Sequence, residues 1–301
     1  PFDKFNTVSN RLSTQMKATG EVMSVGRTIE ESLLKAVRSL EVGVNHIHSG
    51  KFDGYAQSEL EEYVREGRDD RLYALAELIR RGTPLSDLYR LTKIDCLFLQ
   101  KIKNITVLEQ EVAAHPSDPA VLRKAKKAGF SDSFIAELWK MPERALFDLR
   151  LREKILPVYK MIDTCASEFK SYVPYFYSTY EEENESVVSD RKKIVVLGSG
   201  PIRIGQGVEF DYSTVHAIKT IRENGFEAII INNNPETVST DYTTSDKLYF
   251  EPLTLEDVMN ILLLEKPEGD IASLGGQSAI NLVVVLQGRG VRVLGPACRA
   301  I

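Results

Sequence analysis

The sequence is poor in the residues that usually build disulfides and metal sites. It has 3 cysteines and 4 histidines among 301 residues. Cys96, Cys165 and Cys298 lie far apart and are odd in number, which fits a reducing compartment and indicates neither a disulfide framework nor a metal site. His46 and His48 have the spacing H-x-H, but no further ligands lie near them in the sequence. We interpret these two histidines as part of a solvated loop.

The chain also lacks a long apolar run and an excess of positive charge. No stretch approaches the roughly 20 apolar residues that a membrane-spanning helix needs, and no signal peptide is evident. The net charge is −5, and neither the part before Ser186 nor the part from Ser186 onward is basic, so a surface for nucleic-acid phosphates is not indicated. We therefore expect no nucleic-acid partner, no membrane partner and a cytoplasmic protein.

The ends of the sequence give a further expectation. The chain opens at Pro1 rather than at methionine and stops at Ile301, just after a strand-like segment. We expect it to be a piece of a longer polypeptide, so a targeting segment before Pro1 would not be visible in it.

The first part of the chain has the periodicity of helices. Residues 28–43 combine a Thr–Glu capping box with apolar residues that share one helical face. Further segments begin at capping residues and end at Gly82 or near Pro116. Several short helices with short links predict an all-α domain, whose apolar faces form the core and whose charged faces are solvated.

The pattern changes in the second part. Residues 174–190 pass from aromatic to acidic and small polar residues, which is typical of a linker. After Asp190, short apolar β-branched segments alternate with helical segments of about 11 to 15 residues. This alternation predicts parallel βαβ units in an open sheet with helices on both faces.

A glycine-rich loop follows the first of these strands. Gly198-Ser199-Gly200 matches the start of the dinucleotide fingerprint G-x-G-x-x-G, but Arg203 stands at the third glycine. Pro201 removes a backbone N–H, and the second strand ends in Asn232 instead of the acid that binds a ribose. These departures argue against a nicotinamide site. A tight structural turn is the alternative.

The same edge of the sheet is expected to collect polar groups. Arg203 and Glu209 follow the first strand, and Glu236 follows the second. Ligands of open α/β sheets bind where the strands end. A later strand leads into a helix through the sequence GGQS, which contains Gly275, Gly276 and Gln277. This helix start could receive an anion or could simply be capped, and the sequence leaves both open.

Long stretches of the sequence resemble one family. "VLGSGPIRIGQGVEFDY", "NNNPETVSTDYTTSDKLYFEPLTLEDV" and "GGQSAINL" are similar to the start of the second synthetase half of the carbamoyl phosphate synthase large subunit. "STQMKATGEVMSVGRTIEESLLKA" resembles the tail of the first half, the carboxyphosphate domain. The helical part resembles the oligomerisation domain, so that the resemblance covers essentially the whole chain.

The resemblance implies an α plus α/β chain, in which an all-α oligomerisation domain precedes a Rossmann-like, parallel pre-ATP-grasp domain. The boundaries that it suggests are 1–28 for the tail of the first synthetase half, 29–175 for the oligomerisation domain, 176–190 for a linker and 191–301 for the pre-ATP-grasp domain of the second half.

The resemblance also implies a function. The family makes carbamoyl phosphate from bicarbonate, two ATP and ammonia that a glutaminase subunit or domain releases from glutamine, and it serves arginine and pyrimidine biosynthesis. ATP and Mg²⁺ sites would lie mostly outside this segment, and no catalytic residue is expected within it. We therefore expect a segment that associates with copies of itself, forms part of a carbamate tunnel and is inactive alone.

Four residues match positions that line the family's carbamate tunnel: Glu21, Gly207, Glu209 and Glu236. A side chain at Gly207 would narrow a passage, and the glutamates could accept hydrogen bonds from the amino group of carbamate. The alternative for each is a polar group at a strand end that serves only the structure. Arg203 could position the loop or pair with one of these glutamates. No metal site is expected.

Two other functions stay open at this point. One is an NAD(P)-dependent oxidoreductase with a helical cap, which Pro201, Arg203 and Asn232 argue against. The other is a free-standing helical interaction module. The sequence does not give the oligomeric state.

Overall fold

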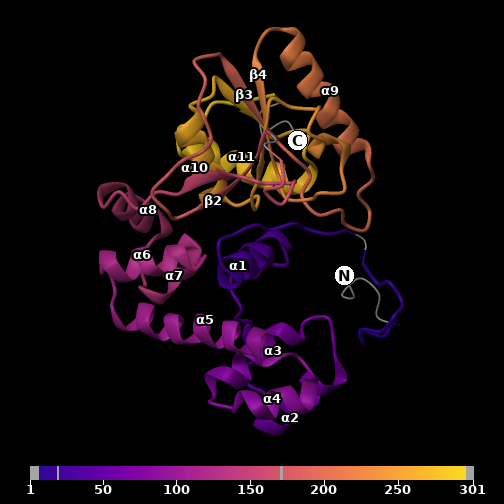
Figure 1. Cartoon of the computed structure of the whole chain (residues 1–301), viewed down its shortest axis with the longest axis vertical. Coiled ribbons are helices and arrows are strands. Elements are labelled where there is room, and N and C mark those ends of the chain that lie inside the picture. The colour runs from indigo at the N-terminus through magenta and orange to yellow at the C-terminus, as the bar shows by residue number, and fades with distance from the viewer. Residues whose placement is uncertain (1–6, 19, 170–171, 296–301) are drawn as a thin grey trace. The chain divides into compact units, whose positions relative to one another are not determined.

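Two units make up the chain. The computed structural model describes residues 7–18, 20–169 and 172–295, which Figure 1 draws in colour. The first unit contains residues 7–18, 28–37 and 42–155, and the second contains residues 20–27, 38–41 and 156–295. Two short early segments therefore belong to the later unit.

The first unit is helical, as the sequence predicts. Its helices are α1 (Ile29–Ser39), α2 (Gln57–Glu66), α3 (Arg71–Arg80), α4 (Leu85–Thr92), α5 (Cys96–Ala114), α6 (Pro119–Lys127), α7 (Asp132–Leu138) and α8 (Glu143–Arg152), with a 3-10 turn η2 (Gly50–Phe52). The last two residues of α1, Arg38 and Ser39, belong to the second unit. Capping side chains set several starts: Asp95, Asp118 and Ser131 accept backbone N–H groups at the first turns of α5, α6 and α7.

A buried charge cluster joins the last three helices of this unit. Nε of Arg150 lies 2.8 Å from Oδ2 of Asp132, and Nζ of Lys126 lies 3.0 Å from the other carboxylate oxygen. Arg150 also donates to the carbonyl of Ile155. All three charged side chains are buried. Because each charge has a partner, the cluster fixes α6, α7 and α8 relative to one another.

The interpretation of the two histidines as a solvated loop is wrong for His46. Its ring is 2% exposed, stacks on Phe134 with 3.7 Å between ring centroids and meets the edge of Phe130. His48 remains partly exposed and contacts Asp53. No group of three or more His, Cys, Asp or Glu residues that could hold a metal ion occurs in the part of the chain that the structure describes.

Burial gives His46 a pH-dependent effect on stability. Desolvation is the main cause that lowers its pKa to about 4, whereas an unfolded histidine titrates near 6.5. Protons therefore bind the unfolded chain first as the pH falls, and the free energy of unfolding decreases between these two values. From pH 7.5 to pH 5 we expect His46 to account for a loss of about 2 kcal/mol.

Urea unfolding followed by fluorescence measures this loss, because the only tryptophan, Trp139, is in the first unit. His46→Gln should weaken the pH dependence by that amount. His48→Gln is the matched control and should leave it unchanged. Equal pH dependence in both variants would contradict the assignment.

The second unit contains the sheet. Its strands are β1 (Val158–Met161), β2 (Tyr175–Thr179), β3 (Lys193–Leu197), β4 (Glu227–Asn232), β5 (Lys247–Phe250), β6 (Gly269–Ile271) and β7 (Val293–Leu294). They lie in the order β1-β2-β5-β4-β3-β6-β7. Only β1 is antiparallel to its neighbour within this sheet of the described residues; the other pairs are parallel. The remaining elements are α9 (Glu209–Glu223), η3 (Val238–Thr240), α10 (Leu255–Glu265) and α11 (Gly276–Gly288).

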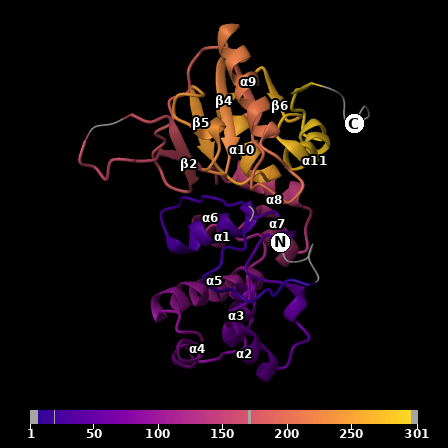
Figure 2. The ribbon, with the colours of Figure 1, turned by 90° about the vertical axis from the view of Figure 1, so that its right-hand side faces the viewer.

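Helices cover both faces of the sheet, as expected for a Rossmann-like domain. Ile218 and Ile221 of α9 pack in one cluster with alternate strand residues such as Val196 and Ile230. Their neighbours in the strands point to the opposite face, where α10 lies. Figure 1 shows α9 and α10 on opposite sides of the strands, and Figure 2 shows α9 in front of them.

Strands β1 and β2 were not predicted from the sequence. They fall in residues that were assigned to the helical domain and to the linker. Aromatic packing explains them, because the rings of Tyr159 and Phe176 lie 5.0 and 5.7 Å from the ring of Tyr249 in β5. Each strand is too short to show a clear alternation of its own.

The amino edge of the sheet holds a buried network of charges. Lys193 and Lys247 begin β3 and β5, and Glu265 ends α10. The two ammonium groups lie 3.1 and 2.7 Å from the Glu265 carboxylate, which also accepts the hydroxyl of Tyr249. Lys247 further donates to the carbonyl of Val187, so the network also holds the segment that precedes β3.

Removal of the central carboxylate should destabilise the second unit. Glu265→Gln removes the carboxylate that pairs with Lys247 and leaves Lys193 to the more distant Glu227 carboxylate at 3.8 Å. Breaking a buried pair in this way costs about 3 to 5 kcal/mol. Urea unfolding followed by circular dichroism should show an earlier transition for the sheet unit, while the Trp139 fluorescence transition stays in place. Glu268→Gln removes an exposed carboxylate nearby and should change neither transition. A Glu265→Gln transition that coincides with that of the control would refute the role of the network.

Candidate functional site at the carboxyl edge of the sheet

The candidate site lies at the carboxyl ends of β3, β4 and β6. From β3 the chain first moves to β4 on one side and later returns to β6 on the other. The direction of the strand order therefore reverses between the neighbouring strands β3 and β6. This is the topological switch point, where open α/β sheets bind ligands. The glycine loop follows β3, and the GGQS segment follows β6.

Two loops approach closely at this point. A Cβ built at Gly275 would lie 2.3 Å from the carbonyl oxygen of Gly198. Gly198 in turn faces the side chain of Asn232, which a Cβ would meet at 2.4 Å. The side-chain amide oxygen of Asn232, Oδ1, accepts a hydrogen bond from the backbone N–H of Gly200 at 3.1 Å. The glycines are thus needed for backbone packing, which supports the structural interpretation of the tight turn.

Arg203 forms a turn at the loop and an ion pair across it. The backbone N–H of Gln206 donates to the carbonyl of Arg203 at 2.9 Å. The guanidinium of Arg203 binds the carboxylate of Glu41, and the hydroxyl of Ser278 donates to the same carboxylate oxygen. Arg203 therefore takes part in the turn of the loop, but its acidic partner is Glu41 and not one of the predicted tunnel glutamates.

The GGQS segment also receives an anion, and that anion is the carboxylate of Glu41. Helix α11 has no side-chain cap at Gly275, while Ser278 in its first turn holds Glu41. Burial raises the pKa of the Glu41 carboxyl above its ordinary value, although Ser278 and Arg203 act in the opposite direction. Gln277 points elsewhere and hydrogen-bonds Asn281 within the helix.

Three consecutive asparagines are buried at the end of β4: Asn232 is its last residue, and Asn233 and Asn234 follow it. Their side-chain nitrogens have no hydrogen-bond partner among the described residues, and neither has the side-chain oxygen of Asn233. Buried amides normally find partners. The edge of the sheet therefore keeps hydrogen-bonding capacity that the folded chain does not use.

The predicted tunnel residues lie on three segments at this edge, and all four are exposed. Glu21 is held by its neighbours, since Gly20 packs on the backbone of Ile202 and the N–H of Met23 donates to the carbonyl of Asn233 at 2.7 Å. A Cβ at Gly207 would meet the Glu209 carboxylate.

The segments that carry Glu209 and Glu236 are joined by Asp211. Its carboxylate accepts the backbone N–H groups of Val238 and Ser239 at 2.8 and 3.2 Å. These bonds join the first turn of α9 to the loop after β4. Sequence analysis missed this positioning role, since the acidic residues of a helix's first turn are expected at any helix start.

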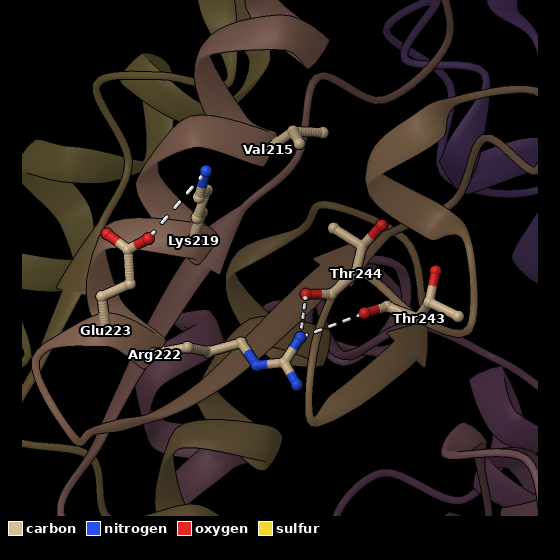
Figure 3. A pocket seen from close by; sticks show the side chains of 6 residues that line it. All are labelled: Val215, Lys219, Arg222, Glu223, Thr243 and Thr244. Atoms are coloured by element: carbon tan, nitrogen blue, oxygen red, sulfur yellow. Dashed lines mark hydrogen bonds and ion pairs between the residues drawn. The ribbon is translucent and has the colours of Figure 1, made fainter.

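A separate pocket of about 320 Å³ lies on the outer side of α9. Figure 3 shows its six lining side chains, among which Arg222 donates to the carbonyls of Thr243 and Thr244 at 3.0 Å and Lys219 pairs with Glu223. The hydrogen bonds of Arg222 hold the loop before β5 against α9. The pocket shares no residue with the sheet edge.

The contact between the two loops can be tested with one pair of variants. Gly275→Ala places a methyl group against two backbone oxygens and should lower the free energy of unfolding by about 1 to 3 kcal/mol. Gly288→Ala lies in the same helix, where a Cβ meets nothing within 4 Å, and should be neutral or stabilising by up to about 1 kcal/mol. Urea unfolding followed by circular dichroism measures both, and equal stabilities would disprove the constraint.

Comparison with known families gives two matches along the chain. A family model of the carbamoyl phosphate synthase preATP-grasp domain matches residues 190–301, and a model of the carbamoyl-phosphate synthetase large chain oligomerisation domain matches residues 21–154. Among the described residues, no helix is both long and apolar enough to cross a membrane. The chain belongs to the carbamoyl phosphate synthetase large-chain family, of which it carries the oligomerisation domain followed by the preATP-grasp domain.

Proposed function

We propose that this chain is the central segment of a carbamoyl phosphate synthase large subunit. The whole enzyme would be a cytoplasmic ligase that uses two ATP with Mg²⁺, bicarbonate, and ammonia from a glutaminase partner. The segment would supply self-association through its helical unit and part of the carbamate path through its sheet unit. The order of the two matched domains along the chain supports this role.

A non-catalytic role fits the chemistry of the sheet edge. The guanidinium of Arg203 at this edge is already paired with Glu41. The glycine loop is packed against Gly275 and Asn232. Within the described residues, no cluster of acids and histidines could hold a metal ion. We therefore assign the ATP and Mg²⁺ chemistry to other parts of the large subunit.

The observation that carries the tunnel proposal is the convergence of three segments on one edge. Residues next to Glu21 contact Ile202 and Asn233, and Asp211 joins the segments of Glu209 and Glu236. Carboxylates at this place accept hydrogen bonds from the amino group of carbamate. Because carbamate is labile in water, a path lined in this way protects it in transit.

Self-association would cover apolar side chains of the helical unit. Leu97 and Phe98 in the first turn of α5 are 55% and 52% exposed, and Tyr89 of α4 is 44% exposed. Exposed apolar groups of this size are typical of protein interfaces. We propose that they contribute to the contact between copies.

A substitution at Gly207 in the full-length large subunit tests the tunnel. Gly207→Leu pushes against the Glu209 carboxylate and should obstruct the path without touching either site of chemistry. Overall carbamoyl phosphate synthesis should fall at least about tenfold. Bicarbonate-dependent ATP hydrolysis, and ATP formation from carbamoyl phosphate and ADP, should stay within about twofold.

The matched control is Gly54→Leu, since Gly54 lies in the helical unit and its Cβ would meet nothing within 4 Å. It should leave all three activities unchanged. A Gly207→Leu enzyme that lost the partial reactions together with the overall reaction would rule out a role confined to passage.

A further inference from the structure

Glu41 occupies a place that is built for an external anion. Its carboxylate lies between the guanidinium of Arg203 and the hydroxyl of Ser278. Ser278 stands in the first turn of α11, a helix of 13 residues. Helix starts next to glycine loops bind phosphates because their N–H groups are free and their dipole is positive.

The backbone of Glu41 is strained where it holds this carboxylate. Glu41 has φ of 54°, in the left-handed region that side chains other than glycine and asparagine rarely adopt. Its side chain is only 15% exposed. Strain of this kind persists where surrounding contacts enforce it. Here Arg38, three residues earlier, is held by Asp257 at 3.4 Å, so residues 38–41 are fastened to the sheet unit at both ends.

The Glu41 carboxylate leaves buried polar atoms around it without hydrogen bonds. Oε1 of Glu41 is buried without a hydrogen-bond partner among the described residues. It lies 2.8 Å from the Cβ position of Gly200, and Oδ1 of Asn233 lies 3.7 Å from the same point. Asn233 is fully buried, and both polar atoms of its side chain are also unpartnered among those residues. A planar carboxylate offers two oxygens, whereas a tetrahedral oxyanion offers four.

We propose that Arg203, Ser278 and the side-chain amide Nδ2 of Asn233 supply the donors of a binding site for a tetrahedral oxyanion of the phosphate class, and that Glu41 is its intramolecular occupant. An external phosphate would take the place of the carboxylate and bind the same Arg203 and Ser278. In the native chain the tethered Glu41 competes at a high effective concentration and keeps the external affinity low. This assignment does not depend on the tunnel.

Removal of Glu41 should therefore create phosphate binding. Glu41→Gly suits the left-handed backbone and takes away the competing carboxylate. We expect inorganic phosphate to bind this variant at least about tenfold more tightly than it binds the native chain. Calorimetric titration at low ionic strength measures the affinity for phosphate. A second titration with added salt screens the exposed charges, so that their contribution to the affinity can be separated from that of the site. Glu41→Gln, which preserves the shape of the side chain, should give a smaller gain.

Two controls fix the interpretation. Glu182→Gly removes an exposed carboxylate from the same unit and should give no gain, so a general effect of net charge is excluded. Arg203→Ala combined with Glu41→Gly should abolish the new binding. The proposal is overturned if both Glu41 variants are folded by circular dichroism and bind phosphate no better than Glu182→Gly. It is also overturned if the new binding survives the loss of Arg203.

Discussion

The close approach of two backbones at the switch point is the constraint on which the sheet edge depends. Gly275 faces the carbonyl oxygens of Leu197 and Gly198 at distances that leave no room for a Cβ. This contact sets where α11 begins. The start of α11 determines where Ser278 holds Glu41, and Glu41 determines where Arg203 lies. A glycine pair thus organises charges that are remote from it in sequence.

The two edges of the sheet treat buried charge differently. At the amino edge, the charges of Lys193 and Lys247 are balanced by the carboxylates of Glu265 and Glu227. At the carboxyl edge, Glu41 is strained and partly unsatisfied, and Asn233 is unpartnered among the described residues. Stability and function often oppose each other in this way, because sites that bind a ligand keep polar groups that the fold alone does not satisfy. The contrast assigns the amino edge to stability.

Periodicity in the sequence predicted the helical unit and the parallel sheet, because these features arise from local repetition of apolar residues. It did not predict β1, whose pairing rests on the aromatic contact of Tyr159 with Tyr249. Nor did it predict the burial of His46, since Phe130 and Phe134 are distant in sequence. The glycine loop and its arginine were found, but the partner of that arginine lies 162 residues away.

The same separation explains why the loop resembles a nucleotide site. A glycine turn beside a helix start favours a negative charge whatever its source, since free N–H groups and the helix dipole act on any anion. In nucleotide-binding domains the charge arrives with the ligand. Here the chain delivers it from residues 38–41, which belong to the sheet unit although they precede it by more than a hundred residues. The glycines of this loop serve backbone packing, and the anion at the helix start must be identified from the residues that reach it.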